Sequence, residues 1–417
     1  MPQPAGFHRT AHGDLVCDGV DLAAIAAAEG TPLYVYSASV LRERYLAIAN
    51  AFGDYPHTLH YALKANSTLA IAALIRRLGG AADANSVWEI ELARRAGFAP
   101  RDIVFTGVGK SASELECAVP MGLKAINVES AGELARVEAI ARQKNLVARV
   151  AIRVNPDIDA KSHPHISTGL KINKFGVPVD EARRLFASLD DRRALTLVAV
   201  HVHVGSQITT LEPLQRAAGT AAVLAAECAK RGRPLEYVDL GGGLGISYDG
   251  SPAPSPQAYA AALVDAIRPT GLPIVVEPGR AIAGPSAVLL ARVVDLKPRD
   301  QSSEFAVIDA GMTELLRPAL YAAYHRIEPV SRREGERRYE VVGPVCESSD
   351  VVGRDRTFGA VDVGDLVAIH DAGAYGSAMA SNYNRRPLPV EVLVDEGRWR
   401  VIRRRQTIDD MLSLEEP

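Results

Sequence analysis

The sequence predicts a (β/α)8 barrel joined to a second, mostly antiparallel β domain. From about residue 57, short β-branched or apolar runs alternate with longer amphipathic stretches, and eight such short runs are present. Eight parallel strands, each followed by a helix, close naturally into a barrel. After about residue 281, strand-like runs continue without long helices between them, which indicates a separate β domain.

The barrel elements follow from hydrophobic periodicity. The eight strands are expected at His57–Leu63, Ala81–Ala84, Ile103–Phe105, Lys124–Val128, Val147–Val154, Leu195–His203, Tyr237–Leu240 and Pro273–Glu277. Apolar residues at three- and four-residue spacing predict helices at Val87–Ala96, Ala112–Val119, Ala131–Arg142, Asp180–Leu189, Leu211–Arg231 and Pro256–Ile267. The segment Asp249–Pro256 is rich in proline, serine and glycine and is expected to be an exposed loop.

The β domain is discontinuous in this prediction. A short Glu396-Gly397 turn separates two strand-like runs and indicates a hairpin. The run Leu33–Tyr36 precedes the barrel and can add a strand to the second domain. Residues 1–36 are therefore assigned to the β domain, residues 37–280 to the barrel and residues 281–417 to the remainder of the β domain. Its other strands are expected at Ala287–Asp295, Phe305–Ile308, Tyr339–Val342, Leu366–Ile369 and Val390–Val394.

Composition excludes several classes of protein. With 47% hydrophobic and 23% charged residues, the chain of 417 residues is an ordinary folded, soluble protein rather than a disordered one. The formal net charge of −3 provides no basic excess for binding nucleic acid or anionic lipid, so a small-molecule partner is favoured. Charged residues interrupt the first thirty positions, no apolar run approaches membrane-spanning length, and four scattered cysteines argue against a disulfide framework. A cytoplasmic location is expected.

Side chains that do chemistry in such a barrel lie just after the strands, where the loops to the helices begin. The first strand ends in Lys64, whose amine would be partly desolvated there and could act as a Schiff-base nucleophile. The structural alternative is a lysine that extends from the barrel mouth into water. Lys64 is the first candidate, and its role depends on the other strand ends.

Glycines and a hydroxyl group follow the seventh and sixth strands. Gly241, Gly242 and Gly243 would let three successive backbone amides approach an anion, and Ser206 adds a second donor. Together with Arg280 they predict a phosphate pocket of the kind that barrels often build after strands seven and eight. The alternative is a tight turn that needs glycine only for its backbone freedom.

Glu277 ends the eighth strand beside that predicted phosphate pocket. A carboxylate there could pair with the protonated ring nitrogen of pyridoxal phosphate (PLP), which keeps the cofactor an effective electron sink. A salt bridge between Glu277 and Arg280 is the structural alternative. His203, at the end of strand six, could lie flat against a cofactor ring or be a satisfied core histidine.

Two other site types fit the sequence less well. The glycine run is not a dinucleotide fingerprint, because Ile246 stands where a glycine or alanine is needed. The His-x-His pairs His163/His165 and His201/His203 raise the possibility of a metal-dependent hydrolase. Such a site needs three or four convergent ligands, whereas the remaining strand ends offer lysine, glycine, glutamate and arginine.

Taken together, these motifs resemble the PLP-dependent decarboxylases with an alanine-racemase-like barrel, and within them the diaminopimelate decarboxylase family. The resemblance covers essentially the whole chain. Its motifs are Tyr61–Asn66 (YALKAN), Arg153–Pro156 (RVNP), Ser167–Gly169 (STG), Lys174–Gly176 (KFG), His201–Gln207 (HVHVGSQ), Asp239–Gly245 (DLGGGLG), Glu277–Arg280 (EPGR), Arg317–Tyr321 (RPALY), Gly343–Asp350 (GPVCESSD), Asp371–Gly376 (DAGAYG) and Tyr383-Asn384.

The resemblance implies a role for each candidate residue. Lys64 would bind PLP covalently, His203 would stack on the ring, and Glu277 would pair with the ring nitrogen. The PLP phosphate would be held by Ser206, Gly241, Gly242, Gly243, Gly279 and Arg280, with Tyr375 nearby. Substrate would be held by Arg280, Arg317, Tyr321, Glu347 and Tyr375. Cys346 would donate a proton, in the partner subunit's site, because the family is an obligate homodimer with shared sites.

The expected reaction is decarboxylation of meso-2,6-diaminopimelate to L-lysine and CO2, the last step of lysine biosynthesis by the diaminopimelate route. The distal amino acid end of that substrate needs an arginine for its carboxylate and a carboxylate for its amine, and Arg317 with Glu347 supplies this pair. In ornithine-type relatives the cysteine is usually followed by aspartate, whereas Glu347 follows Cys346 here. The alternatives are decarboxylation of ornithine, arginine or carrier-linked glutamate, and a non-catalytic PLP-binding protein.

Two positions depart from the family pattern. Val87 and Trp88 stand where the family commonly has two glycines after the second strand, and Ser349 stands where glycine is frequent. Both leave room for an altered substrate.

Overall fold

Eight parallel strands form a closed barrel. The computed structural model describes residues 6–160, 168–170 and 172–416. Each barrel strand pairs in parallel with its neighbours, and the ring closes where Ile274 and Val276 pair with His57 and Leu59. This confirms the predicted fold class. The barrel strands are β5 (His57–Ala62), β6 (Ala81–Ala84), β7 (Ile103–Phe105), β8 (Ala125–Val128), β9 (Ala148–Asn155), β11 (Leu195–Val202), β12 (Tyr237–Asp239) and β13 (Ile274–Val276).

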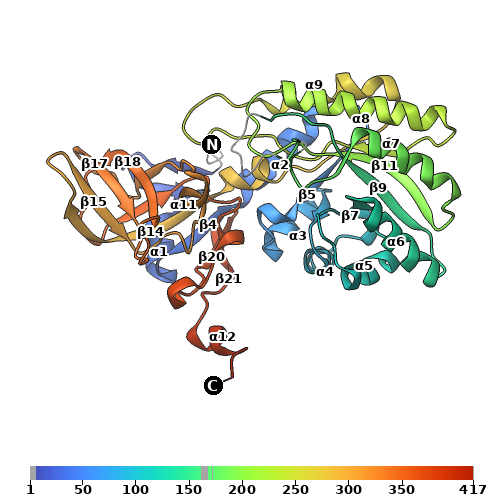
Figure 1. Cartoon of the computed structure of the whole chain (residues 1–417). Helices are drawn as coiled ribbons and strands as arrows, with labels where there is room; N and C mark the ends of the chain where they lie inside the picture. Colours follow the sequence, from blue (N-terminus) through green and yellow to red (C-terminus); the bar gives the residue numbers. More distant parts are fainter. Residues whose placement is uncertain (1–5, 161–167, 171, 417) are drawn as a thin grey trace. The chain divides into compact units, whose positions relative to one another are not determined.

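Helices follow the barrel strands and lie along the outside of the barrel (Figure 1). Four of them begin at a serine whose hydroxyl accepts a hydrogen bond from the backbone amide three residues later: Ser86, Ser111, Ser130 and Ser255. All six predicted helices are present within two residues of their expected bounds. The helices are α3 (Leu69–Arg77), α4 (Val87–Arg95), α5 (Ala112–Ala118), α6 (Ala131–Gln143), α7 (Val179–Ser188), α8 (Glu212–Lys230) and α9 (Pro256–Ile267); a short strand β10 (Val177–Pro178) pairs with β9.

A second sheet is mostly antiparallel, as predicted. Its strands are ordered β18-β17-β15-β14-β4-β20-β21, and among the described residues only the pairs β15 with β17 and β4 with β20 are parallel. The predicted hairpin is present as β20 and β21, with Glu396 and Gly397 at positive φ in its turn. The strands are β4 (Leu33–Ser37), β14 (Ala287–Pro298), β15 (Ser303–Ile308), β16 (Ile327–Pro329), β17 (Glu336–Val342), β18 (Val351–Gly359), β19 (Leu366–Ile369), β20 (Val390–Asp395) and β21 (Arg398–Arg403).

Several elements were not predicted. Strand β18 carries polar side chains along much of its length, and its position at the end of the sheet order explains why. Helix α3 was also not predicted. The others are too short for periodicity to reveal them, or lie before residue 57. They are β10, β16, β1 (Phe7–Arg9), β2 (Leu15–Cys17), β3 (Val20–Asp21), α1 (Leu22–Glu29), α2 (Ala38–Ala51), α10 (Arg280–Ala283), α11 (Arg317–Tyr321) and α12 (Ile408–Leu412).

The chain divides into two compact units. The barrel unit comprises Tyr45–Ile246 and Pro252–Ala281, and the β unit comprises Met1–Arg44, Ser247–Ser251 and Ile282–Pro417. The core of the β unit is built around β4, where Leu33 and Val35 pack with Val288 and Leu290 of β14. In the described parts of the chain, no helix has both the length and the apolar character needed to cross a membrane.

Candidate active site

Lys64 lies in a 3-10 turn directly after β5, and its amine faces a carboxylate of the neighbouring strand. Lys64 Nζ is 3.2 Å from Oδ2 of Asp83 on β6. The Asp83 side chain is fully buried, whereas that of Lys64 is 35% exposed. Lys64 therefore does not simply extend into water, because its ammonium is paired with a buried negative group at the barrel mouth. Asp83 was not among the predicted site residues, although an aspartate within a short buried strand is a signal that could have identified it.

Glu277 directly follows β13 and is almost fully buried. Its Oε2 lies 3.4 Å from Nε2 of His201 on β11, whereas its Oε1 has no hydrogen-bonding partner among the described residues. Arg280, the alternative partner considered above, contacts Ser206 instead. A buried carboxylate oxygen that lacks a partner is the kind of group that a bound ligand satisfies.

Asp83, Asp239 and Glu277 are three buried carboxyl groups that lie near one another, and their environments shift their pKa values in different directions. Burial and the charge of Glu277 raise the pKa of Asp83 and of Asp239. Burial also opposes ionisation of Glu277, but the charge and hydrogen bond of His201, with the charge of Lys64, hold its pKa well below its usual range. Of the three carboxyl groups, Glu277 therefore ionises most readily.

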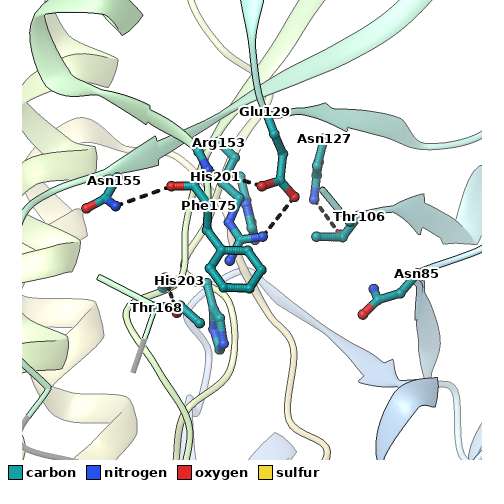
Figure 2. Close-up of polar contacts among 12 residues, drawn as sticks. Asn85, Thr106, Asn127, Glu129, Arg153, Asn155, Thr168, Phe175, His201 and His203 are labelled. Atoms are coloured by element: carbon teal, nitrogen blue, oxygen red, sulfur yellow. Dashed lines mark hydrogen bonds and ion pairs between the residues drawn. The ribbon is translucent and has the colours of Figure 1, made fainter. Parts of the chain in front are cut away.

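His203 lies just after β11, and its ring is held in one tautomer. The backbone amide of Gly242 donates to His203 Nδ1 at 3.1 Å, so the ring proton must be on Nε2. Burial, followed by the charges of Lys64 and Arg153, holds the pKa of His203 well below its usual value. The imidazole is therefore neutral. Figure 2 shows His203 near Thr168, whose hydroxyl donates to the His203 carbonyl at 2.9 Å.

The predicted phosphate pocket has a hydroxyl group beside a buried guanidinium. Arg280 donates through Nε and Nη2 to Ser206 Oγ, at 3.3 and 3.0 Å. The expectation that three successive amides face an anion is wrong for two of them, because Gly241 donates to Asp239 Oδ1 at 3.0 Å and Gly242 donates to His203. These two amides therefore hold strand ends together within the barrel unit.

Close packing explains why glycine is required at Gly242 and Gly279. A Cβ at Gly242 would lie 2.3 Å from the Glu277 carbonyl oxygen, and one at Gly279 would lie 2.8 Å from Ala65 Cβ. Any side chain at either position would push apart loops that carry Glu277 and Lys64.

These residues fit PLP. An amine, a buried carboxylate with one unpartnered oxygen, a neutral imidazole and a hydroxyl–guanidinium pair lie after strands of the same barrel. They match, in turn, the aldehyde, the ring nitrogen, the ring face and the phosphate of the cofactor.

The metal-site alternative takes a different form from the predicted one. His163 and His165 lie outside the described residues, and His203 contacts Gly242 rather than converging with His201. Ligand atoms of His201, Asp239 and Glu277 do lie within 4.8 Å of one another. Glu277, however, is the carboxylate that the PLP ring nitrogen would require.

A buried ion pair supports the same rim of the barrel. Arg153 of β9 donates to Glu129 Oε1 at 2.8 Å (Figure 2). The amide of Gly176 donates to Glu129 Oε2 at 3.0 Å. The guanidinium also lies over the Phe175 ring, 4.7 Å from its centroid. This pair therefore ties the Phe175-Gly176 turn to β9.

Replacing Arg153 by methionine is expected to destabilise the protein by about 3–5 kcal/mol, because Glu129 would remain buried without its cation. The measurement is the free energy of unfolding in urea. Arg149→Met is the matched control, since its pair with Glu236 is exposed and should cost less than about 1 kcal/mol. Equal losses in the two variants would show that the Arg153 pair does not stabilise the fold.

The other candidate residues belong to the β unit. Arg317 begins α11 and is buried, and Tyr321 ends the same helix. Tyr375 follows β19 and has a positive φ of 57°. Cys346 and Glu347 are exposed in the turn between β17 and β18, and Tyr383 donates to Glu347 Oε1 at 2.7 Å.

Hydrogen bonds to the Asp350 carboxylate hold the turn that carries Cys346. The Val345 amide donates to Asp350 Oδ2 at 2.7 Å, and the Met312 amide donates to Oδ1 at 2.6 Å. Asp350 itself is buried. The thiol is therefore presented on a fixed backbone although its side chain is exposed.

Of the residues that depart from the family pattern, Trp88 and Ser349 are exposed and Val87 is half-buried. Trp88 is 80% exposed, so its ring does not fill the barrel interior. Ser349 is also exposed, and its hydroxyl contacts Met312 Sδ at 3.8 Å.

Known proteins place the chain in a family. Residues 38–284 match the model of the pyridoxal-dependent decarboxylase, pyridoxal binding domain. The chain is 41% identical to the diaminopimelate decarboxylase of Vibrio cholerae over 411 residues, which covers 98% of each chain.

Solved structures agree with this match. Diaminopimelate decarboxylase from Helicobacter pylori complexed with L-lysine superposes with a TM-score of 0.92 at 41% identity, covering 95% of this chain and 99% of that one. The enzyme from M. jannaschii in co-complex with L-lysine superposes with a TM-score of 0.94 at 34% identity, covering 99% and 98%. The chain belongs to the pyridoxal-dependent decarboxylases, and within them to the diaminopimelate decarboxylase family.

Proposed function

We propose that this protein is a PLP-dependent decarboxylase that converts meso-2,6-diaminopimelate to L-lysine and CO2, the last step of lysine biosynthesis. The observation that carries this proposal is the pairing of Lys64 with Asp83 beside Glu277, a buried carboxylate that is held ionised and has one unpartnered oxygen. Relatives named diaminopimelate decarboxylase, two of them solved with L-lysine, support the choice of substrate.

Residues of the barrel unit would hold the cofactor. Lys64 would bind it through Nζ, Glu277 would face its ring nitrogen, and His203 would lie against the ring. The phosphate would be held by Ser206, Gly241, Gly242, Gly243, Gly279 and Arg280, with Tyr375 nearby; Gly241 and Gly242 would act mainly by holding the loop. When bound, PLP supplies an electron sink for the pair that remains when CO2 leaves.

The charges of the barrel residues suit that chemistry. The anionic Glu277 would keep a proton on the ring nitrogen, because an opposite charge in a buried site favours the protonated form. His203, being neutral, would add no positive charge that would lower the pKa of the ring nitrogen. In the protein without PLP, Asp83 would stabilise the ammonium form of Lys64.

Residues of the β unit would hold substrate and supply a proton. Arg317 would bind the distal carboxylate and Glu347 the distal ammonium through charge-assisted hydrogen bonds, with Arg280, Tyr321 and Tyr375 completing the contacts. Cys346 would donate a proton from Sγ to the carbon that lost CO2.

The protein would act as a cytoplasmic homodimer in which each Cys346 serves the site of the partner subunit. The exposure of Cys346 and Glu347 in the single chain supports this arrangement, because a general acid must be excluded from water when it acts.

The test is an absorbance spectrum of the purified protein with PLP, followed by CO2 measurement across a substrate panel. A visible band that changes on adding meso-diaminopimelate, with CO2 released and L-lysine formed, is the expected result. If CO2 is released from ornithine, arginine or carrier-linked glutamate instead, the proposed substrate is wrong but the proposed reaction, decarboxylation, stands. A band with no CO2 from any member of the panel would leave a non-catalytic PLP-binding protein.

A further inference from the structure

Arg317 is buried, yet its proposed task requires the guanidinium to point in one direction. Arginine has several rotatable bonds, and ordering such a side chain costs about 2 kcal/mol of rotamer entropy. Neighbouring groups that hold the guanidinium before substrate arrives would remove this cost from binding. Two such groups are present in the β unit.

The first group is His325, which is fully buried in the β unit. Arg317 Nη1 lies 2.8 Å from His325 Nε2, and His325 Nδ1 lies 2.8 Å from the carbonyl oxygen of His370. An arginine can only donate and a carbonyl can only accept, so Nε2 must be the acceptor and Nδ1 must carry the proton. Both contacts therefore require the neutral imidazole in one tautomer.

The histidine is itself held by backbone rather than by a mobile side chain. His370 directly follows β19, and its amide donates to the Arg326 carbonyl at 2.8 Å. The sequence of contacts therefore runs from the sheet through His325 to the guanidinium. This is the usual arrangement by which a second residue orients a binding residue.

The second group is the ring of Tyr248. The Arg317 guanidinium lies over this ring, 4.6 Å from its centroid, and the same ring meets His325 edge to face at 5.3 Å. A planar guanidinium stacks well on an aromatic face. Arg317 is therefore held by a hydrogen bond that it donates to one neighbour and by the aromatic face of another.

We propose that His325 is a positioning residue that aims Arg317 at the distal carboxylate of the substrate. This inference rests on the proposed function. Decarboxylation removes the carboxylate next to the amine bound at the cofactor, so the product L-lysine keeps the distal carboxylate, whereas cadaverine lacks it. His325 thereby sets the preference of the site for L-lysine over cadaverine.

The experiment compares equilibrium binding of L-lysine and of cadaverine to the PLP-loaded protein by calorimetry. His325→Phe keeps a ring against Tyr248 but removes the acceptor. It should weaken L-lysine binding by roughly 10-fold to 100-fold, the loss expected for a hydrogen bond to a charged group, and leave cadaverine binding about unchanged. His325→Gln places an amide oxygen near the former Nε2 and should restore most of the preference for L-lysine.

Activity provides a second readout. The KM for diaminopimelate should rise by a similar factor in His325→Phe while kcat changes little, as expected for lost binding of the unreactive end. His57→Phe is the matched control, because His57 is a partly buried histidine stacked on Phe52. It begins β5, whereas Lys64 follows the other end of that strand. Binding of both ligands by this variant should equal that of the wild type.

Equal losses for L-lysine and cadaverine in His325→Phe, or an unchanged preference, would overturn the proposal. If His325→Phe does not fold, His325→Asn takes its place, because its shorter amide cannot reach Arg317 while His325→Gln can. The two variants must then differ in the preference for L-lysine. Wild-type protein that does not itself prefer L-lysine over cadaverine would instead contradict the proposed function, before any variant is compared.

Discussion

Replacing Lys64 by alanine is expected to abolish the visible absorbance of the PLP-loaded protein and to lower CO2 release by roughly 10³-fold or more. The reason is chemical, because Nζ of Lys64 is the amine that lies beside Asp83 at the end of β5 and would bind the cofactor aldehyde. The measurement is the spectrum after adding PLP and removing the excess, together with CO2 release from diaminopimelate.

A second variant separates this chemistry from folding. Lys64→Ala leaves the buried Asp83 without its cation and can destabilise the barrel. Lys64→Arg keeps a positive charge near Asp83, but its guanidinium stays protonated and cannot bind the aldehyde. Both variants should lack the visible band, whereas Lys144→Ala, at an exposed position, should retain it. A visible band that survives in Lys64→Arg would remove Lys64 from its proposed role.

Replacing Cys346 by alanine is expected to leave the cofactor spectrum intact while turnover falls by roughly 10²–10⁴-fold, the contribution of a positioned general acid. The thiol lies on a turn held by Asp350 in the β unit. Cofactor content and kcat are measured on the same sample. Cys117→Ala is the matched control, because it removes another exposed free thiol. Loss of PLP from Cys346→Ala would make Cys346 a structural residue instead.

Mixing the two inactive proteins tests whether sites are shared between subunits. In a two-fold dimer that exchanges subunits, about half of the dimers would contain one Lys64→Ala and one Cys346→Ala chain. If Cys346 serves the partner's site, each hybrid has one intact site, and activity should recover to about a quarter of the wild-type value. No recovery, with subunit exchange verified by mass, would show that each chain supplies both residues to one site.

Much of the candidate site could be predicted, because a barrel collects its functional residues at the strand ends. Alternating strands and helices predicted the barrel, and that prediction directed attention to Lys64, His203 and Glu277, all of which lie just after β strands in the barrel unit. Strand bounds were also close, since β-branched and apolar runs are local signals. Strand β18 was missed because its polar residues hide the alternation that marks a strand.

The partners of those residues could not be predicted from the sequence. Lys64 meets Asp83 at a separation of 19 residues, Glu277 meets His201 at 76, and Gly242 meets His203 at 39. The amides of Gly241 and Gly242 were expected to face an anion, but they donate to Asp239 and His203. These partners too could not be predicted from the sequence. No local pattern encodes such pairs, because they depend on which loops the closed barrel brings together.

The sequence by itself determined the class of fold, the family and the residue types that carry the chemistry, because periodicity and short motifs are local properties of a chain. Only the tertiary structure decided the state of each group: that the pKa of Glu277 is lowered while the pKa values of Asp83 and Asp239 are raised, that His203 is neutral, and that Arg317 is held by His325 and Tyr248. The physical reason is that charge state and orientation are set by burial and by neighbours in space, which the order of residues along the chain does not specify.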